Sequence, residues 1–270
     1  MSNQGTCGPQ ETLHQIVSLY LSSRPSFYAF IRPQEAFLLR QNISLLQRPI
    51  LDFGCGDGFF TNVLHAGQWV DAGLDIDEEK IGRAHAVKSY KKLLCFDGER
   101  IPFASESFAT IFSNSVLEHI SHLEITLGEI YRVLRPEGIF ITTVMSDKWE
   151  QSLPLGKILG KRYVHWLRKR QRHKNLFSYQ KWQDTFNDHG FTSGAVIGYV
   201  NEKTSQYLEV CHYCSLLSLL SYKLSGVWVP FPHWHKPLKL AKKITSIIQD
   251  DINTPIPDSS ALFFILKKAP

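Results

Sequence analysis

The sequence predicts an α/β fold with a doubly wound, mostly parallel sheet, and two observations carry this prediction. From residue 50 to residue 144, short apolar runs rich in β-branched residues alternate with helical segments, as in a parallel sheet wrapped by helices. The first run ends in a glycine-rich turn, Gly54-Cys55-Gly56-Asp57-Gly58, that leads directly into a helical segment. Such a strand, turn and helix present backbone N–H groups and a helix N-terminus to a ligand.

Length, charge and cysteine content set the broad class. The 270-residue chain is long enough for one large α/β domain with appended elements. Its net charge of +5 is mildly basic, which fits an acidic substrate or a membrane surface without requiring either. The N-terminus carries no pattern of an export signal, so a cytoplasmic location is expected. The five scattered cysteines indicate reduced thiols rather than disulfides: Cys7, Cys55, Cys95, Cys211 and Cys214.

Two helices are expected before the sheet, over residues 11–22 and 34–46. The second would begin just after Pro33, because proline suits the first turn of a helix. An aromatic patch of Phe27, Tyr28 and Phe30 lies between them. This patch could form a lid over a ligand or pack on the sheet edge, and the sequence favours neither. Residues 1–33 are interpreted as an N-terminal helical segment or lid.

The remaining elements follow in chain order. Strands are expected at 50–53, 72–77, 92–97, 108–113, 139–144, within 194–200 and at 261–267. Helices are expected from the glycine turn to His65 and at 78–90, 117–134, 179–189 and 238–248, whereas 208–234 is left unassigned. This predicts a core over residues 34–200 with a basic insertion at 145–181. An apolar and basic insertion at 201–256 and a final core strand within 257–270 complete the chain.

Polar groups follow four successive strands, at the edge of the sheet where parallel α/β proteins bind ligands. The first strand ends in Asp52 and the glycine turn, and the second ends in Asp75 and Ile76. An acid at the second position can accept hydrogen bonds from both hydroxyls of a ribose. The third strand ends in the pair 97–98, an acid and a glycine suited to an adenine amino group and ring nitrogen. The fourth ends in the short polar side chains of 113–115.

These motifs, in this order, resemble those of the class I S-adenosylmethionine-dependent methyltransferases. The resemblance is strong over residues 34–144 and is greatest to the branch that includes quinone, sterol and other small-molecule methyltransferases. It implies a Rossmann-like sheet of seven strands whose last strand is antiparallel. The segments that carry it are LDFGCGDG at 51–58, LDID at 74–77, CFDGERIPF at 95–103, SFATIF at 107–112, VLEHI at 116–120 and YRVLRPEG at 131–138.

The resemblance implies S-adenosyl-L-methionine as the cofactor. The glycine turn would hold the methionine moiety, Asp75 the ribose, and Asp97 with Gly98 the adenine, while the polar end of the fourth strand would line the methionine side. The residues expected to bind the cofactor are Asp52, Gly54, Cys55, Gly56, Gly58, Asp75, Ile76, Asp97, Gly98, Ser113, Asn114 and Ser115.

Glu118 and His119 are the candidate catalytic residues, because they follow the fourth strand on the side of the transferring methyl group. Transfer from a sulfonium needs positioning and, for a hydroxyl acceptor, a base. His119 is the candidate base, since an imidazole titrates near neutrality. The alternative, that both residues only cap or orient the next helix, carries slightly more weight. No metal site is expected, and O- or C-methylation is favoured over nucleobase N-methylation because no Asn/Asp-Pro-Pro-Tyr/Phe motif follows the fourth strand.

The two insertions fall where this family recognises its acceptor. Residues 152–181 contain nine Lys and Arg and no acidic residue. They could grip a phosphate or carboxylate of a small-molecule or lipid-linked acceptor, or seat the enzyme on an anionic membrane. They could also be a solvated basic helix, whereas nucleic acid is not favoured. A second functional class, an inactive cofactor-binding protein that acts as a partner or scaffold, remains open. A nicotinamide dehydrogenase is disfavoured by Phe59 at the position of a third glycine.

Overall fold

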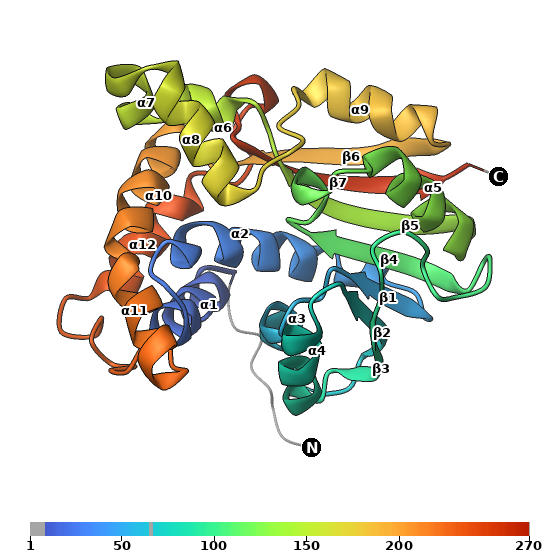
Figure 1. Cartoon of the computed structure of the whole chain (residues 1–270), viewed down its shortest axis with the longest axis horizontal. Helices are drawn as coiled ribbons and strands as arrows, with labels where there is room; N and C mark the ends of the chain where they lie inside the picture. The colour runs from blue at the N-terminus through green and yellow to red at the C-terminus, as the bar shows by residue number, and fades with distance from the viewer. Residues whose placement is uncertain (1–8, 65–66, 270) are drawn as a thin grey trace.

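The computed structural model describes residues 9–64 and 67–269, so Cys7 and His65 lie outside the described residues. A seven-stranded sheet with the strand order β3-β2-β1-β4-β5-β7-β6 runs through the molecule (Figure 1). Strands β1 to β5 are parallel to one another, and β7 is antiparallel to both β5 and β6. The fold class predicted from the sequence is confirmed. The strands are β1 Ile50–Phe53, β2 Val70–Asp75, β3 Tyr90–Cys95, β4 Phe108–Asn114, β5 Leu134–Met145, β6 Phe191–Tyr199 and β7 Ala261–Lys268.

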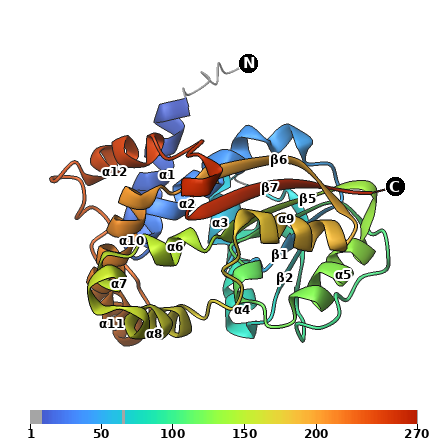
Figure 2. The same cartoon turned by 90° about the horizontal axis from the view of Figure 1, so that it is seen from above.

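Helices cover both faces of the sheet (Figure 2). One face packs on α1 Pro9–Ser23, α2 Tyr28–Gln41, α3 Phe59–Leu64 and α12 Leu240–Gln249, and the other packs on α5 Leu123–Val133 and α9 Tyr179–Asp188. The other helices are α4 Glu78–Ala84, α6 Lys148–Gln151, α7 Pro154–Leu159, α8 Lys161–Gln171, α10 Glu202–Cys214 and α11 Leu216–Ser225. Short 3₁₀ turns occur at η1 Ile43–Leu45, η2 His85–Val87, η3 Leu117–His119 and η4 Ile256–Asp258.

The ligand-binding edge is set by the position of β1 in the sheet. All four residues of β1 are buried, as expected for a central strand covered on both faces. Strand β2 pairs on one side of β1 and β4 on the other, so the strand order reverses at this point. Crevices at such a reversal, beyond the carboxyl ends of the strands, are the usual ligand sites of open α/β sheets.

The expected start of the second helix is wrong. Helix α2 begins at Tyr28 and continues through Pro33, which the sequence placed before its first turn. Ala29, Phe30 and Ile31 are buried against the core, and this packing outweighs the cost of an interior proline. The aromatic patch contacts α10, because the ring of Phe30 stacks on that of Tyr207 with centroids 5.7 Å apart. Neither the lid nor the sheet-edge alternative anticipated this contact.

Several boundaries differ from the expected ones for local reasons. Strands β2 and β3 end two residues earlier than expected, and the side chain of Asp77 accepts the N–H of Lys80 as the cap of α4. The helix expected to reach residue 90 ends after η2, where Lys88 takes a left-handed conformation. Residues 135–138, expected as a turn, lie within β5 at a register shift. The unassigned stretch 208–234 contains the end of α10 and all of α11. Among the described residues, no helix is long and apolar enough to cross a bilayer.

Candidate functional site

The three glycines of the turn differ in what surrounds them. Gly54, Gly56 and Gly58 all have positive φ, of 79°, 56° and 74°, which side chains other than glycine rarely adopt. A Cβ at Gly54 would lie 2.4 Å from the side chain of Val116, so this position must be glycine for packing. A Cβ at Gly56 would meet nothing within 4 Å. The open space beside Gly56 is therefore available to a ligand, at the N-terminal end of α3.

Asp52 lies beneath the glycine turn rather than facing the crevice. Its carboxylate is buried and accepts the hydroxyls of Thr61, at 2.6 Å, and of Tyr90, at 2.7 Å. Burial raises the pKa of this carboxyl to about 7. The Cys55 thiol is also buried, and burial raises its pKa well above the usual range. These two residues, expected among the cofactor ligands, are placed where they hold the turn in shape.

Asp75 joins the glycine turn to the end of β2. One carboxylate oxygen accepts the N–H of Gly56 at 2.8 Å, and the other accepts the N–H of Asp77 at 3.0 Å. Each oxygen keeps further lone-pair capacity, because an ionised carboxylate has about four acceptor sites. The carboxylate therefore lies at the rim of the open space beside Gly56, with room for additional donors.

The ends of β2 and β3 form a small apolar surface beside an acid. This surface, made by Ile76 and Gly98, is called the apolar step below. Ile76 is 67% exposed, and a Cβ at Gly98 would lie 3.4 Å from its side chain. Asp97 is exposed, and its Oδ1 accepts the backbone N–H groups of Glu99 and Arg100. These hydrogen bonds lower the pKa of Asp97, so its carboxylate stays ionised. Neither of the two N–H groups donates to Oδ2. A flat ring could pack on the apolar step while its amino group donates to this acid.

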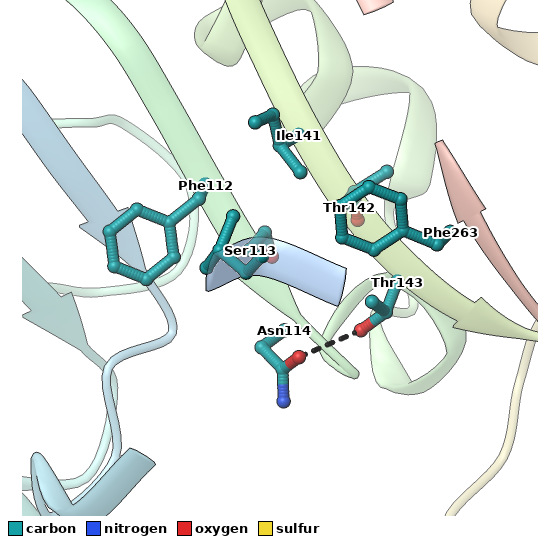
Figure 3. Close-up of a pocket in the computed structure, with 8 residues that line it drawn as sticks. Phe112, Ser113, Asn114, Ile141, Thr142, Thr143 and Phe263 are labelled. Carbon is teal, nitrogen blue, oxygen red and sulfur yellow. Dashed lines mark hydrogen bonds between the residues drawn. The ribbon is translucent and has the colours of Figure 1, made fainter. Parts of the chain in front are cut away.

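The end of β4 supplies short polar groups that are fixed by β5. The hydroxyl of Thr143 donates to Asn114 Oδ1 at 3.1 Å (Figure 3). The N–H of Ser115 donates to the same hydroxyl at 2.8 Å. The Ser113 hydroxyl is buried and has no hydrogen-bond partner within the described part of the chain. A cavity of about 10 Å³, enough for one water, lies among these residues, Phe112 and the neighbouring strands.

Glu35 of α2 organises this end of β4, although it lies some eighty residues upstream. Its carboxylate is fully buried and accepts hydrogen bonds from Asn114 Nδ2 and Ser115 Oγ, both at 2.8 Å. It also accepts from Arg32 at 2.7 Å and from the Tyr199 hydroxyl at 3.0 Å. One buried carboxylate thus ties α2, β4 and β6 together at the candidate site.

The N-terminal helices also reach the glycine turn. Arg24, just after α1, forms an ion pair with Asp57 at 2.6 Å, and its guanidinium lies 4.2 Å from the centre of the Phe59 ring. Arginine combines charge with a planar face, so one side chain can make both contacts. The segment before the sheet is therefore part of the wall of the site.

Glu118 and His119 lie in η3, after β4, and differ in environment. Glu118 is 1% exposed, and burial raises the pKa of its carboxyl to about 8, so it is mostly protonated at neutral pH. His119 is exposed at its edge, and its ring stacks on His173 with centroids 5.0 Å apart. Partial loss of water around the ring lowers the pKa of His119, and the charge of Arg32 lowers it further. His119 is therefore neutral at physiological pH and can accept a proton.

Comparison with known proteins identifies the domain. Residues 51–142 match the family model described as "Methyltransferase domain". The chain is 31% identical over 168 residues to the mouse protein "Ubiquinone biosynthesis O-methyltransferase, mitochondrial", an overlap of 58% of this chain and 45% of that protein. It is 34% identical over 99 residues to "Malonyl-[acyl-carrier protein] O-methyltransferase" of Erwinia pyrifoliae, covering 36% and 37% of the two chains. Over residues 51–142 the chain is thus similar to methyltransferase domains.

Solved structures support the fold over nearly the whole length of the chain. A Thermotoga maritima methyltransferase described as a possible histamine N-methyltransferase superposes with a TM-score of 0.57 at 15% identity, covering 96% of this chain and 97% of that one. The [4+2]-cyclase SpnF superposes with a TM-score of 0.55 at 13% identity, covering 97% and 94%. The fold therefore accommodates more than one chemistry, and the site must carry the argument about activity. The chain spans less than half the length of the two curated relatives described above.

The expected site residues lie at or near the carboxyl ends of β1 to β4, and sequence reasoning missed several residues that support them. Glu35, Arg24 and Tyr199 belong to segments outside the recognised motifs. A polar hydroxyl in the otherwise apolar run 195–200 was the available signal for Tyr199, whereas Glu35 follows Arg32 and Gln34 and gave no such signal. Among the described residues, no group of three or more His, Cys, Asp or Glu could hold a metal ion.

Replacing the buried acid Glu118 is expected to change how the stability of the protein depends on pH. In the unfolded chain Glu118 ionises above about pH 4.5, whereas the folded protein keeps the proton until about pH 8. The folded state thus binds more protons in this window, and stability falls as pH rises through it. Glu118→Gln should remove this loss. The free energy of unfolding of the variant, relative to that of the wild type, should therefore increase by up to about 4 kcal/mol from pH 5 to pH 8.

The measurement is urea unfolding at pH 5 and at pH 8. Glu99→Gln, which neutralises an exposed acid, is the matched control and should show no such gain. A stability difference between Glu118→Gln and the wild type that is the same at both pH values would contradict the assigned burial effect.

Proposed function

We propose that the protein transfers a methyl group from S-adenosyl-L-methionine to oxygen or carbon of a small-molecule or lipid-linked acceptor. The observation that carries this proposal is the glycine turn at the end of β1, where Asp75 of β2 accepts the N–H of Gly56 and a Cβ on Gly56 would meet no atom within 4 Å. The family match over residues 51–142 supports it.

The residues around this turn fit the cofactor. The space that a Cβ at Gly56 would fill can take the methionine moiety against the turn. Asp75 can accept from the ribose hydroxyls, while the apolar step of Ile76 and Gly98 suits the adenine ring and Asp97 its amino group. The buried, unpaired Ser113 hydroxyl on the methionine side provides a donor and an acceptor without a protein partner in the described chain.

The cofactor supplies a methyl group already activated on a sulfonium, so the protein mainly positions and deprotonates. Asn114 and Ser115, held by Glu35, fix the wall on the methyl side. His119 is the candidate base, because its lowered pKa leaves the ring neutral and able to take a proton from a hydroxyl acceptor. Glu118, mostly protonated in its buried position, is better suited to donating a hydrogen bond than to accepting a proton.

An anionic acceptor is supported by the basic segment beside the candidate base. The backbone N–H groups of Lys174 and Asn175 both donate to the carbonyl of Glu118, at 2.7 and 3.0 Å. The carbonyl of Arg172 lies 3.3 Å from His119 Nδ1. The backbone of the basic segment therefore lies against Glu118 and His119, and the exposed Arg172 and Lys174 are available to hold a phosphate or carboxylate near the reacting group. The named relatives act in ubiquinone biosynthesis and on malonyl-[acyl-carrier protein], which is consistent with a small-molecule or carrier-linked acceptor.

We also propose a cytoplasmic enzyme in peripheral contact with a membrane, where lipid-linked acceptors occur. Four described cysteines are free thiols, which is typical of a reducing compartment. Nucleic acid is not proposed as a substrate.

Methyl transfer can be tested with a labelled methyl donor and a panel of acceptors that includes a prenylated phenol and a long-chain acyl carboxylate. Label should appear in at least one acceptor. With a hydroxyl acceptor, His119→Gln should lower kcat by about 10²–10⁴-fold. In the wild type the rate should rise with pH as the imidazole loses its proton, at a pH below the usual pKa of histidine, and this rise should be absent in the variant. Cofactor affinity, measured by calorimetric titration, should change little.

His122→Gln, a nearby exposed histidine, is the matched control. Full activity of His119→Gln would show that His119 is not the base. Binding of the cofactor without transfer to any acceptor would favour the inactive partner or scaffold instead.

A further inference from the structure

We propose that this protein docks on an anionic lipid bilayer through a surface formed by α7, α8, α10, α11 and the loop 226–239. This surface is called the docking surface below. The inference deepens the proposed membrane contact by naming the surface and the lipid charge that it requires. It rests on exposed apolar area, on the distribution of charge and on the position of these helices relative to the site.

Exposed apolar side chains are concentrated on the docking surface. Of the seventeen large hydrophobic residues exposed in the described part of the chain, thirteen belong to it. Leu217, Leu224 and Phe231 are each at least 75% exposed, and α11 buries none of its residues. Scattered single apolar residues need no explanation, but a contiguous group marks an interaction site. The thirteen are Ile158, Leu159, Trp166, Tyr207, Val210, Leu216, Leu217, Leu220, Leu224, Val227, Phe231, Trp234 and Leu238.

The docking surface carries ten Lys and Arg against two acids, Glu202 and Glu209, and it lies within a wider basic part of the chain. Residues 152–181 and 210–249 contain fourteen of the thirty Lys and Arg and none of the twenty-five Asp and Glu. The remaining 200 residues therefore have sixteen basic and twenty-five acidic side chains and are net negative. A modest total charge of +5 thus conceals a strongly basic part of the protein. Basic residues beside exposed apolar ones match an anionic lipid surface, which attracts each Lys or Arg by about 1 kcal/mol.

The helices of the docking surface are held in place by specific contacts. The hydroxyl of Tyr163 on α8 lies 2.6 Å from that of Tyr213 on α10 and also donates to Glu209. Arg83 of α4 donates to the hydroxyl of Tyr222 on α11, and the Tyr222 ring stacks on Trp228. Both views place α7, α8, α10 and α11 at one end of the molecule, away from the C-terminus (Figures 1 and 2). The apolar and basic side chains are thus presented together on one end.

The length and composition of these helices favour lying in the bilayer interface over crossing it. Helix α11 has ten residues, about 15 Å, which is half the thickness of the hydrocarbon core. Trp166 and Trp234 are partly exposed, and tryptophan prefers the interface between lipid and water. Neither another protein nor RNA would require so much exposed leucine and phenylalanine together with clustered positive charge.

The docking surface continues to the mouth of the site. Helix α8 is followed directly by Arg172 and His173, and the ring of His173 stacks on the candidate base His119. An acceptor held by its tail in the bilayer could therefore present its polar head beside the basic residues at the site. This arrangement explains why the acceptor insertions are both basic and apolar.

The proposal can be tested by flotation of the full chain with lipid vesicles. Vesicles containing about a third phosphatidylserine should bind the protein, pure phosphatidylcholine vesicles should bind it much less, and added salt should weaken the binding. The triple variant Leu217→Ser, Leu224→Ser, Phe231→Ser should bind at least about tenfold less. Charge reversal by Lys169→Glu with Arg170→Glu should weaken binding most at low salt.

Ile125→Ser, which removes an exposed apolar side chain of α5 outside the docking surface, is the matched control and should bind normally. Absence of flotation with anionic vesicles would overturn the proposal, as would full binding by the triple variant. A dimer that dissociates in the triple variant, or RNA binding without vesicle binding, would assign the surface to another partner. Vesicle binding requires no methyl transfer, so failure to bind vesicles is distinguishable from failure of the proposed activity. As a check on folding, titration with the cofactor should give the same affinity for the triple variant and the wild type.

Discussion

Asp75→Ala should abolish measurable binding of S-adenosyl-L-methionine. The carboxylate can accept from both ribose hydroxyls, and hydrogen bonds to a charged group contribute about 1.5–3 kcal/mol each. It also holds the N–H groups of Gly56 and Asp77, so its loss loosens the turn that bounds the open space. The dissociation constant should rise by at least about 100-fold. Calorimetric titration of the purified variant, beside an NADH titration of the wild type, measures this effect.

The control for this experiment is Asp71→Asn. Asp71 lies at the opposite end of the same strand, where it accepts from Arg48 and Lys91. Its replacement is expected to cost some stability and to leave cofactor affinity within about twofold. Wild-type affinity in a folded Asp75→Ala protein would remove Asp75 from the binding site, and tight NADH binding by the wild type would point to the dehydrogenase alternative.

Glu35→Ala should be the most destabilising single substitution among those considered. The buried carboxylate accepts from Arg32, Asn114, Ser115 and Tyr199, and its removal leaves these donors without their acceptor. Breaking a buried ion pair by removing one partner typically costs about 3–5 kcal/mol, because the other charge stays buried and unpaired. Urea unfolding followed by circular dichroism measures the free energy of unfolding.

Glu79→Ala provides the comparison, since Glu79 forms an exposed ion pair with Arg83 on α4. Exposed pairs contribute about 0–1 kcal/mol, so this variant should unfold almost like the wild type. Glu35→Gln keeps the size of the side chain, so its loss in free energy of unfolding should lie between those of Glu35→Ala and Glu79→Ala. A loss below about 1 kcal/mol for Glu35→Ala would mean that the network on the methyl side does not depend on this carboxylate.

The fold and most of the crevice could be predicted because their determinants are local. Alternating apolar runs and helical segments predicted the seven strands, and the glycine turn 54–58 marked the ligand-binding end of the first one. Parallel strands place successive carboxyl ends at one edge, so Asp75, Asp97 and residues 113–115 could be assigned to one crevice before their distances were known.

Where prediction failed, packing between distant segments decided the outcome. Helix α2 starts before Pro33 because burial of its first turn outweighs the local signal of proline. Asp52 was expected among the cofactor ligands, and the structure shows it buried, with the hydroxyls of Thr61 and Tyr90 both donating to its Oδ2. No local pattern could reveal either result, since both depend on which side chains meet in the folded core.

The sequence by itself thus determined the alternating architecture, the glycine turn and the order of the groups that would hold the cofactor, because each depends on residues close together in the chain. Only the tertiary structure showed that Glu35 anchors Asn114 and Ser115, that Glu118 is buried and mostly protonated, and that the apolar helices 202–225 share one end with the basic helix 161–171. The physical reason is that burial, pKa and shared surface are properties of neighbours in space, which come from segments separated by tens of residues in the chain.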